Sequence, residues 1–104
     1  MNGFYALKGS KIQKARVFKK LGKVNEARAL FHEILTKSSL YNQACAFAGL
    51  NEKKNMLKTL EMAIKEREEY RIEARFDPDF EEYQGDPDFQ KLVYRGRKNQ
   101  TLFL

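Results

Sequence analysis

The chain has 104 residues, of which 42% are hydrophobic and 33% are charged, and its formal net charge is +6. This length fits one globular domain with a modest core, and the composition argues against intrinsic disorder. The longest apolar run, residues 44–50, is too short to cross a bilayer, so no membrane association is expected. A single cysteine cannot form an internal disulfide, and we therefore expect a protein of the reducing cytoplasm.

Residues 1–9 are predicted to be an N-terminal extension of a domain that covers residues 10–93. The apolar stretch in this extension is interrupted by Lys8 and Gly9, which argues against a signal peptide. Ser10 is expected to cap a first helix, and Gly22 is expected to end it in the left-handed conformation. Apolar side chains recur at helical spacing between these two residues: Ile12, Ala15, Val17, Phe18 and Leu21.

A second helix is expected to start between Lys23 and Asn25. The pattern of apolar and small residues in residues 12–35, which span both helices, recurs at residues 41–64. We call the offset from Ala15 to Ala44 one repeat step. The apolar face of the second helix consists of Ala27, Leu30, Phe31, Ile34 and Leu35. The two copies, at about residues 10–37 and 38–66, share three identities: Ala15/Ala44, Phe18/Phe47 and Leu21/Leu50. The sequence therefore predicts two antiparallel helix pairs.

A C-terminal cap is predicted at about residues 67–93. Between residues 52 and 76 no helix breaker occurs, so one long helix and two helices joined near residues 65–69 are both compatible with the sequence. The fading of the apolar pattern after Ile64 favours two helices. Asp77 and Asp86 each precede a proline, which is typical of a helix N-cap, and Phe80 and Phe89 are expected to cover the end of the core. Residues 94–104 form a basic and apolar tail, whose Leu102-Phe103-Leu104 end either stays free or docks on a groove.

The doubled pattern resembles the tetratricopeptide repeat, a helix-turn-helix unit of about 34 residues. The segment Tyr41-Asn42-Gln43-Ala44-Cys45 resembles an opening common in bacterial members of this family. The two Asp-Pro-Asp-Phe segments at residues 77–80 and 86–89 are similar to those that close such arrays. The resemblance implies an all-α fold, an α-solenoid fragment of two helix pairs plus capping helices. From the residues alone, a generic antiparallel helix bundle is the alternative.

The resemblance also implies a non-catalytic adaptor that binds a peptide or protein segment on the concave face, which the first helix of each pair lines. The side chains expected there are Ile12, Arg16, Lys19, Lys20, Tyr41, Asn42 and Cys45. Basic residues beside an exposed tyrosine and asparagine suit an acidic peptide. With two pairs the groove would be shallow, and formation of a homodimer would strengthen binding.

No catalytic residue, cofactor or metal site is predicted. His32 lacks a second histidine at the spacing that a zinc-binding helix needs, and Cys45 has no cysteine or histidine partner at ligand spacing. Cys45 is instead expected to be a small packing residue.

The charges are distributed unevenly along the chain. Residues 1–23 contain seven basic residues and no acid, whereas residues 65–92 contain ten acids and five bases. One interpretation is attraction between the two ends of the domain, and another is nucleic-acid (RNA) binding through the basic N-terminal helix. Since the basic stretch holds no acid, charge reversal at Arg16 and Lys20 is expected to abolish partner binding with little effect on stability.

Overall fold

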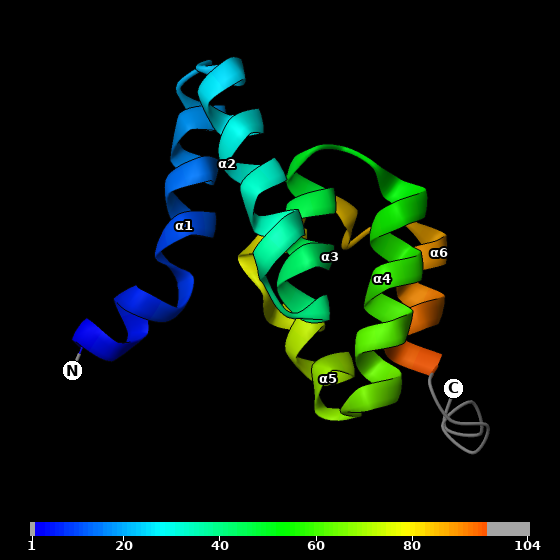
Figure 1. Cartoon of the computed structure of the whole chain (residues 1–104). Coiled ribbons are helices and arrows are strands. Elements are labelled where there is room, and N and C mark those ends of the chain that lie inside the picture. Colours follow the sequence, from blue (N-terminus) through cyan, green and yellow to red (C-terminus); the bar gives the residue numbers. More distant parts are fainter. Residues whose placement is uncertain (1, 96–104) are drawn as a thin grey trace.

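The computed structural model describes the backbone of residues 2–95 and the side chains of residues 11–94; within this part of the chain there are helices and no strand. Two antiparallel pairs come first (Figure 1): α1 (Asn2–Lys20) with α2 (Val24–Lys37), then α3 (Leu40–Gly49) with α4 (Lys53–Glu66). Four short helices follow: α5 (Glu69–Phe76), η1 (Pro78–Tyr83), α6 (Pro87–Gln90) and η2 (Lys91–Arg95). The predicted all-α fold of helix pairs and capping helices is confirmed. The predicted tail end, Leu102-Phe103-Leu104, lies outside the described residues.

The sequence repeat is present in the backbone itself. Helix α4 starts and ends one repeat step after α2, and the end of α3 follows the end of α1 by the same step. Each first helix closes with the same motif, in which Gly22 (φ 81°) and Asn51 (φ 62°) take the left-handed conformation. In that motif the amide of Lys23 donates to the Phe18 carbonyl over 2.8 Å, and the amide of Glu52 donates to the Phe47 carbonyl over 3.0 Å.

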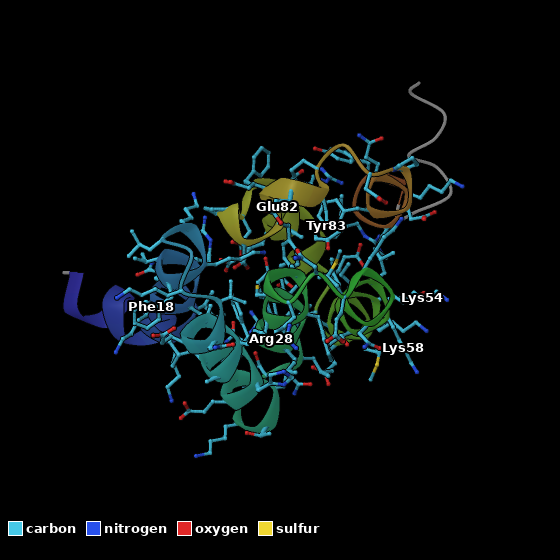
Figure 2. The ribbon with its side chains drawn as sticks, turned by 90° about the horizontal axis from the view of Figure 1, so that it is seen from above. Phe18, Arg28, Lys54, Lys58, Glu82 and Tyr83 are labelled. Atoms are coloured by element: carbon cyan, nitrogen blue, oxygen red, sulfur yellow. The ribbon has the colours of Figure 1, made fainter. Side chains whose placement is uncertain are left out.

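The core runs through both pairs and continues under the cap. Helix α3 packs against α4, α2 and η1, and it comes so close to α2 that a Cβ on Gly49 would lie 2.2 Å from the Phe31 ring. Phe18 and Phe47 are half-buried against the core. Seen from above, η1 with Glu82 and Tyr83 lies beside α3, and Lys54 and Lys58 point outward from α4 (Figure 2). The largest fully buried side chains are Phe31, Met56, Leu60, Phe80, Phe89 and Val93.

The C-terminal cap forms as predicted. The chain breaks between α4 and α5 at residues 67–68, which answers the question of one helix or two. The Asp77 carboxylate accepts from the amide of Asp79, and the Asp86 carboxylate accepts from the amides of Asp88 and Phe89. These N-caps precede prolines in the first helical turn, so each Asp-Pro pair starts a short helix that buries its phenylalanine.

Two sequence predictions about the first helix are wrong. Helix α1 begins at Asn2 and continues through Ser10, so Ser10 is not its N-cap. Gly9 does not end the helix, because a glycine within a helix costs only about 1 kcal/mol. Val17 and Leu21 are exposed rather than in the core, since they lie on the side of α1 away from α2.

Candidate groove between the first helices

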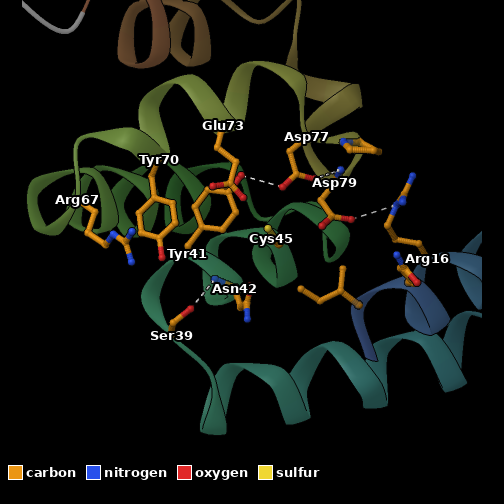
Figure 3. Close-up of a pocket in the computed structure, with 13 residues that line it drawn as sticks. Arg16, Ser39, Tyr41, Asn42, Cys45, Arg67, Tyr70, Glu73, Asp77 and Asp79 are labelled. Carbon is orange, nitrogen blue, oxygen red and sulfur yellow. Dashed lines mark hydrogen bonds and ion pairs between the residues drawn. The ribbon is translucent and has the colours of Figure 1, made fainter. Parts of the chain in front are cut away.

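A groove of about 320 Å³ lies between α1, α3, α5 and the start of η1 (Figure 3). Five of the seven residues predicted to bind a partner line it: Ile12, Arg16, Tyr41, Asn42 and Cys45. The other two, Lys19 and Lys20, line a smaller cavity of about 210 Å³ between α1 and η1, to which Arg16 also contributes. The structure thus brings all seven residues to one side of the first helices but divides them between two cavities.

The groove contains the same helical position of three successive first helices. One repeat step leads from Ile12 to Tyr41 and a second leads to Tyr70, and all three residues line the groove. Helix α5 starts one repeat step after α3, so it is a third first helix. Its Phe76 corresponds to Phe18 and Phe47 but is 78% exposed, because the chain turns into η1 and no second helix among residues 2–95 covers this ring.

Aromatic stacking builds one wall of the groove. The rings of Tyr41 and Tyr70 stack with centroids 4.5 Å apart, and the Arg67 guanidinium lies over Tyr70 at 5.6 Å. Tyr41 donates a hydrogen bond from its hydroxyl to the Asp77 carboxylate over 2.8 Å. The prediction that Tyr41 is exposed is wrong: only 5% of the residue is accessible, because Tyr70 covers its ring. Burial and the neighbouring acids also raise the pKa of its hydroxyl, so Tyr41 stays protonated.

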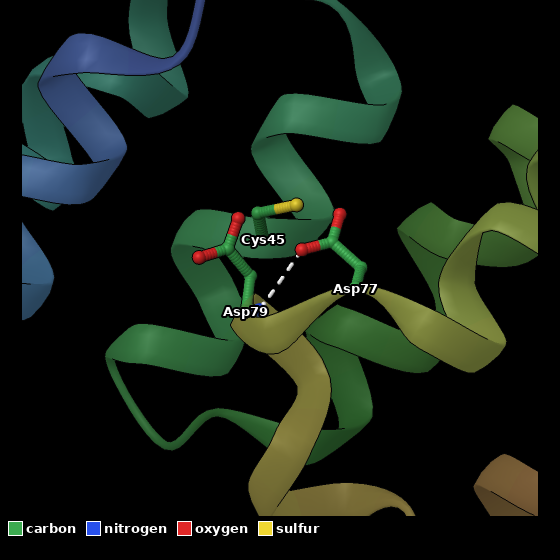
Figure 4. Close-up of side chains that lie close together, drawn as sticks. All are labelled: Cys45, Asp77 and Asp79. Carbon is green, nitrogen blue, oxygen red and sulfur yellow. Dashed lines mark hydrogen bonds between the residues drawn. The ribbon is translucent and has the colours of Figure 1, made fainter.

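The floor of the groove holds Cys45, Asp77 and Asp79, whose sulfur and carboxylate oxygens lie within 4.8 Å of one another (Figure 4). Burial, followed by the charge of Asp77, raises the pKa of Asp79 to about 6, although the nearby Arg16 acts in the opposite direction. Burial, followed by the charges of Asp79 and Asp77, likewise raises the pKa of the Cys45 thiol. The Asp77 carboxylate already accepts a hydrogen bond from Tyr41, and the Asp79 carboxylate is already paired with Arg16. The positive charge of Arg16 beside the cluster also disfavours a metal cation there. These contacts support structural roles, and we assign no metal to the three residues.

The basic residues of α1 face the acids of η1. Arg16 lies 3.3 Å from Asp79, and the Lys20 ammonium lies 3.9 Å from Glu81. The Lys19 ammonium lies 3.6 Å from Glu82 and donates to the Gly49 carbonyl over 2.9 Å. The interpretation that the two ends of the domain attract each other is therefore confirmed. The expectation that Arg16 and Lys20 have no compensating acids is wrong, because those acids come from the C-terminal cap, far away in the sequence.

Two polar side chains in the groove remain available for a ligand. The side chains of Asn42 and Gln13 line the groove and make no hydrogen bond within the described part of the chain. Glu73 and Arg67 lie at the same opening and are exposed. Arg67, Tyr70 and Glu73 also line the groove but were not among the predicted binding residues, although one further repeat step from Tyr41 leads to Tyr70.

Comparison of the chain with protein-family models, with curated proteins and with solved structures gives no match. Across residues 2–95, no helix has both the length and the apolar character that a bilayer crossing requires. The functional assignment therefore depends on the geometry of the groove.

Proposed function

We propose that the protein is a non-catalytic adaptor of the tetratricopeptide type that binds a short segment of another protein in the groove. The observation that carries this proposal is the meeting of Ile12, Tyr41 and Tyr70, three equivalent positions, in one cavity. A volume of about 320 Å³ is in the range of sites that hold a few side chains. The apolar wall would bury a side chain of the segment, and Asn42 and Gln13 would hydrogen-bond its backbone.

The charges of the groove favour a segment with a lysine or arginine. Three carboxyl groups line the groove, those of Glu73, Asp77 and Asp79, against the two arginines Arg16 and Arg67. Because Arg16 is already paired with Asp79, it is poorly placed to receive an acid from outside. A cationic side chain of the segment beside the exposed Glu73 would form an ion pair with its carboxylate. This partner differs from the acidic peptide that the sequence suggested.

Nucleic-acid binding through the N-terminal helix has less support. Arg16, Lys19 and Lys20 each lie within 4.0 Å of an acid of η1, which reduces the positive potential of this surface. The half-buried Phe18 packs against the core, so it is not free to stack on a base.

The test is selection of short random peptides against the protein, followed by affinity measurements with groove variants. Glu73→Lys and Asn42→Ala should each weaken binding of the selected peptides about tenfold, since each removes a polar contact. Glu69→Lys is the matched control, because Glu69 is an exposed acid on the same helix that does not line the groove. Tighter binding to Glu73→Lys would point to an acidic segment instead. Equal effects of Glu73→Lys and Glu69→Lys, or no selected peptide, would contradict the proposal.

A further inference from the structure

The second surface of interest is the outer face of α1, which we define by Val17, Lys20 and Leu21. Val17 is 54% exposed and Leu21 is 65% exposed, and they lie one turn apart on the helix. Val24, the first residue of α2, adds a further exposed apolar side chain nearby. Exposed apolar side chains that gather on one helix face mark a surface that another element covers.

The molecule itself contains the covered form of this face. One repeat step leads from Val17, Lys20 and Leu21 to Ala46, Gly49 and Leu50. These three residues form one stripe at α3, with Ala46 fully buried and Leu50 8% exposed. Helix α2 packs on α3, and its Phe31 ring lies directly against Gly49. The repeat therefore shows that a helix with a large apolar side chain fits this stripe.

The outer face of α1 differs from its counterpart in charge. Lys20 replaces Gly49, so a helix on this face cannot approach as closely as α2 approaches α3. The Lys20 side chain is 67% exposed and its ammonium is held loosely, at 3.9 Å from Glu81. Residues 11–32 contain seven basic residues and a single acid, Glu26. Four of the seven face acids of α2 or η1, and Lys14, Lys23 and Arg28 have no ion pair within the described residues. A covering helix thus gains ion pairs if it carries acids next to its apolar stripe.

We propose that the outer face of α1 binds an amphipathic helix of another protein, with an aromatic or large aliphatic stripe flanked by acidic residues. The interaction goes beyond the groove, since Val17 and Leu21 line neither of the two cavities described above and the ligand is helical rather than extended. The partner helix takes the place relative to α1 that α2 takes relative to α3.

The probe is a hydrocarbon-stapled peptide with the sequence of residues 24–37, the helix that already packs on the equivalent stripe. One version carries Arg28→Glu and Lys37→Glu and is acidic, and the other carries Glu26→Lys and Glu33→Lys and is basic. Stapling is needed because a helix of this length is marginal alone in water. In fluorescence anisotropy, the acidic peptide should bind wild type about tenfold more tightly than the basic one does.

Two variants of the protein make the test specific. Val17→Glu/Leu21→Glu should weaken binding of the acidic peptide at least about tenfold, whereas Ile72→Glu, at a residue 57% exposed on α5, should leave it unchanged. Lys20→Glu leaves Val17 and Leu21 unchanged and reverses only the charge between them. It should therefore reverse the preference between the acidic and the basic peptide. Absence of binding to wild type, or equal loss in Ile72→Glu, would overturn the proposal. So would sedimentation showing a dimer that Val17→Glu/Leu21→Glu abolishes, since the face would then belong to a second copy of the chain.

Discussion

In the second helix pair Ala46 and Leu50 are buried, whereas Val17 and Leu21, at the same positions of the first pair, are more than half exposed. The backbones of the two pairs nevertheless match residue for residue at their turns, at the last residues of α1 and α3, and at both ends of α2 and α4. The difference arises because α3 has a helix on this side and α1 has none within the described residues. Position in the repeat therefore determines local structure, and neighbouring elements determine burial.

The largest expected effect comes from breaking the contact that joins the two pairs. Phe31→Ala should lower the free energy of unfolding by about 3–5 kcal/mol, because this fully buried ring fills the space between α2 and α3. Urea denaturation measures the loss. His32→Ala, at the exposed neighbouring residue, is the control and should change stability by no more than about 0.5 kcal/mol.

The contact between α2 and α3 can also be overpacked by a larger residue on α3. Gly49→Ala places a Cβ at 2.2 Å from the Phe31 ring, so we expect a loss of about 1–3 kcal/mol. Lys20→Ala makes a change at the equivalent position of the first pair, where the side chain is 67% exposed, and should be close to neutral. Similar losses in both variants, measured by thermal unfolding, would show that the two pairs do not differ in the way described.

Asp79 lies between Arg16 and Cys45, which occupy the same position of the two pairs, and its pKa of about 6 gives a pH test. Its ordinary value is 3.8, so between about pH 4 and pH 6 the folded protein binds a proton that the unfolded chain has released. This carboxyl group therefore lowers stability as the pH rises through that window and destabilises the fold above it. Relative to Asp79→Asn, wild type should lose on the order of 2 kcal/mol between about pH 4 and pH 6. A flat difference between the two stability curves would refute the assignment.

The smallest effect concerns the turns that the two pairs share. Gly22→Ala should cost about 1 kcal/mol, since φ is 81° at this residue and a Cβ is strained there. Asn51→Gly, at the equivalent turn, should relieve strain at φ 62°, although it also removes the hydrogen bond from Lys19. We expect it to be nearly neutral in thermal unfolding. A large loss of stability in Asn51→Gly would show that the hydrogen bond from Lys19, rather than the backbone conformation of the turn, determines the stability at this position.

The sequence predicts features that depend on local chemistry. Gly22 as a helix stop, Asp77 and Asp86 as N-caps, and Phe80 and Phe89 as buried rings all follow from residue types at short spacing. The burial of Tyr41 and the pairing of Arg16 with Asp79 do not, because they depend on where distant parts of the chain are placed. Val17 and Leu21 have the apolar character of core residues, and only the absence of a neighbouring helix among the described residues leaves them exposed.

The central claim, that the first helices jointly form a binding groove, is tested most directly by NMR. The labelled protein is titrated with the tightest peptide from the random selection, and amide shifts are mapped onto the structure. We expect the changes to centre on Gln13, Asn42 and Tyr70, which come from three different helices around one cavity. Shifts that leave Asn42 and Tyr70 unchanged and cluster elsewhere, for example along α4, would contradict the account.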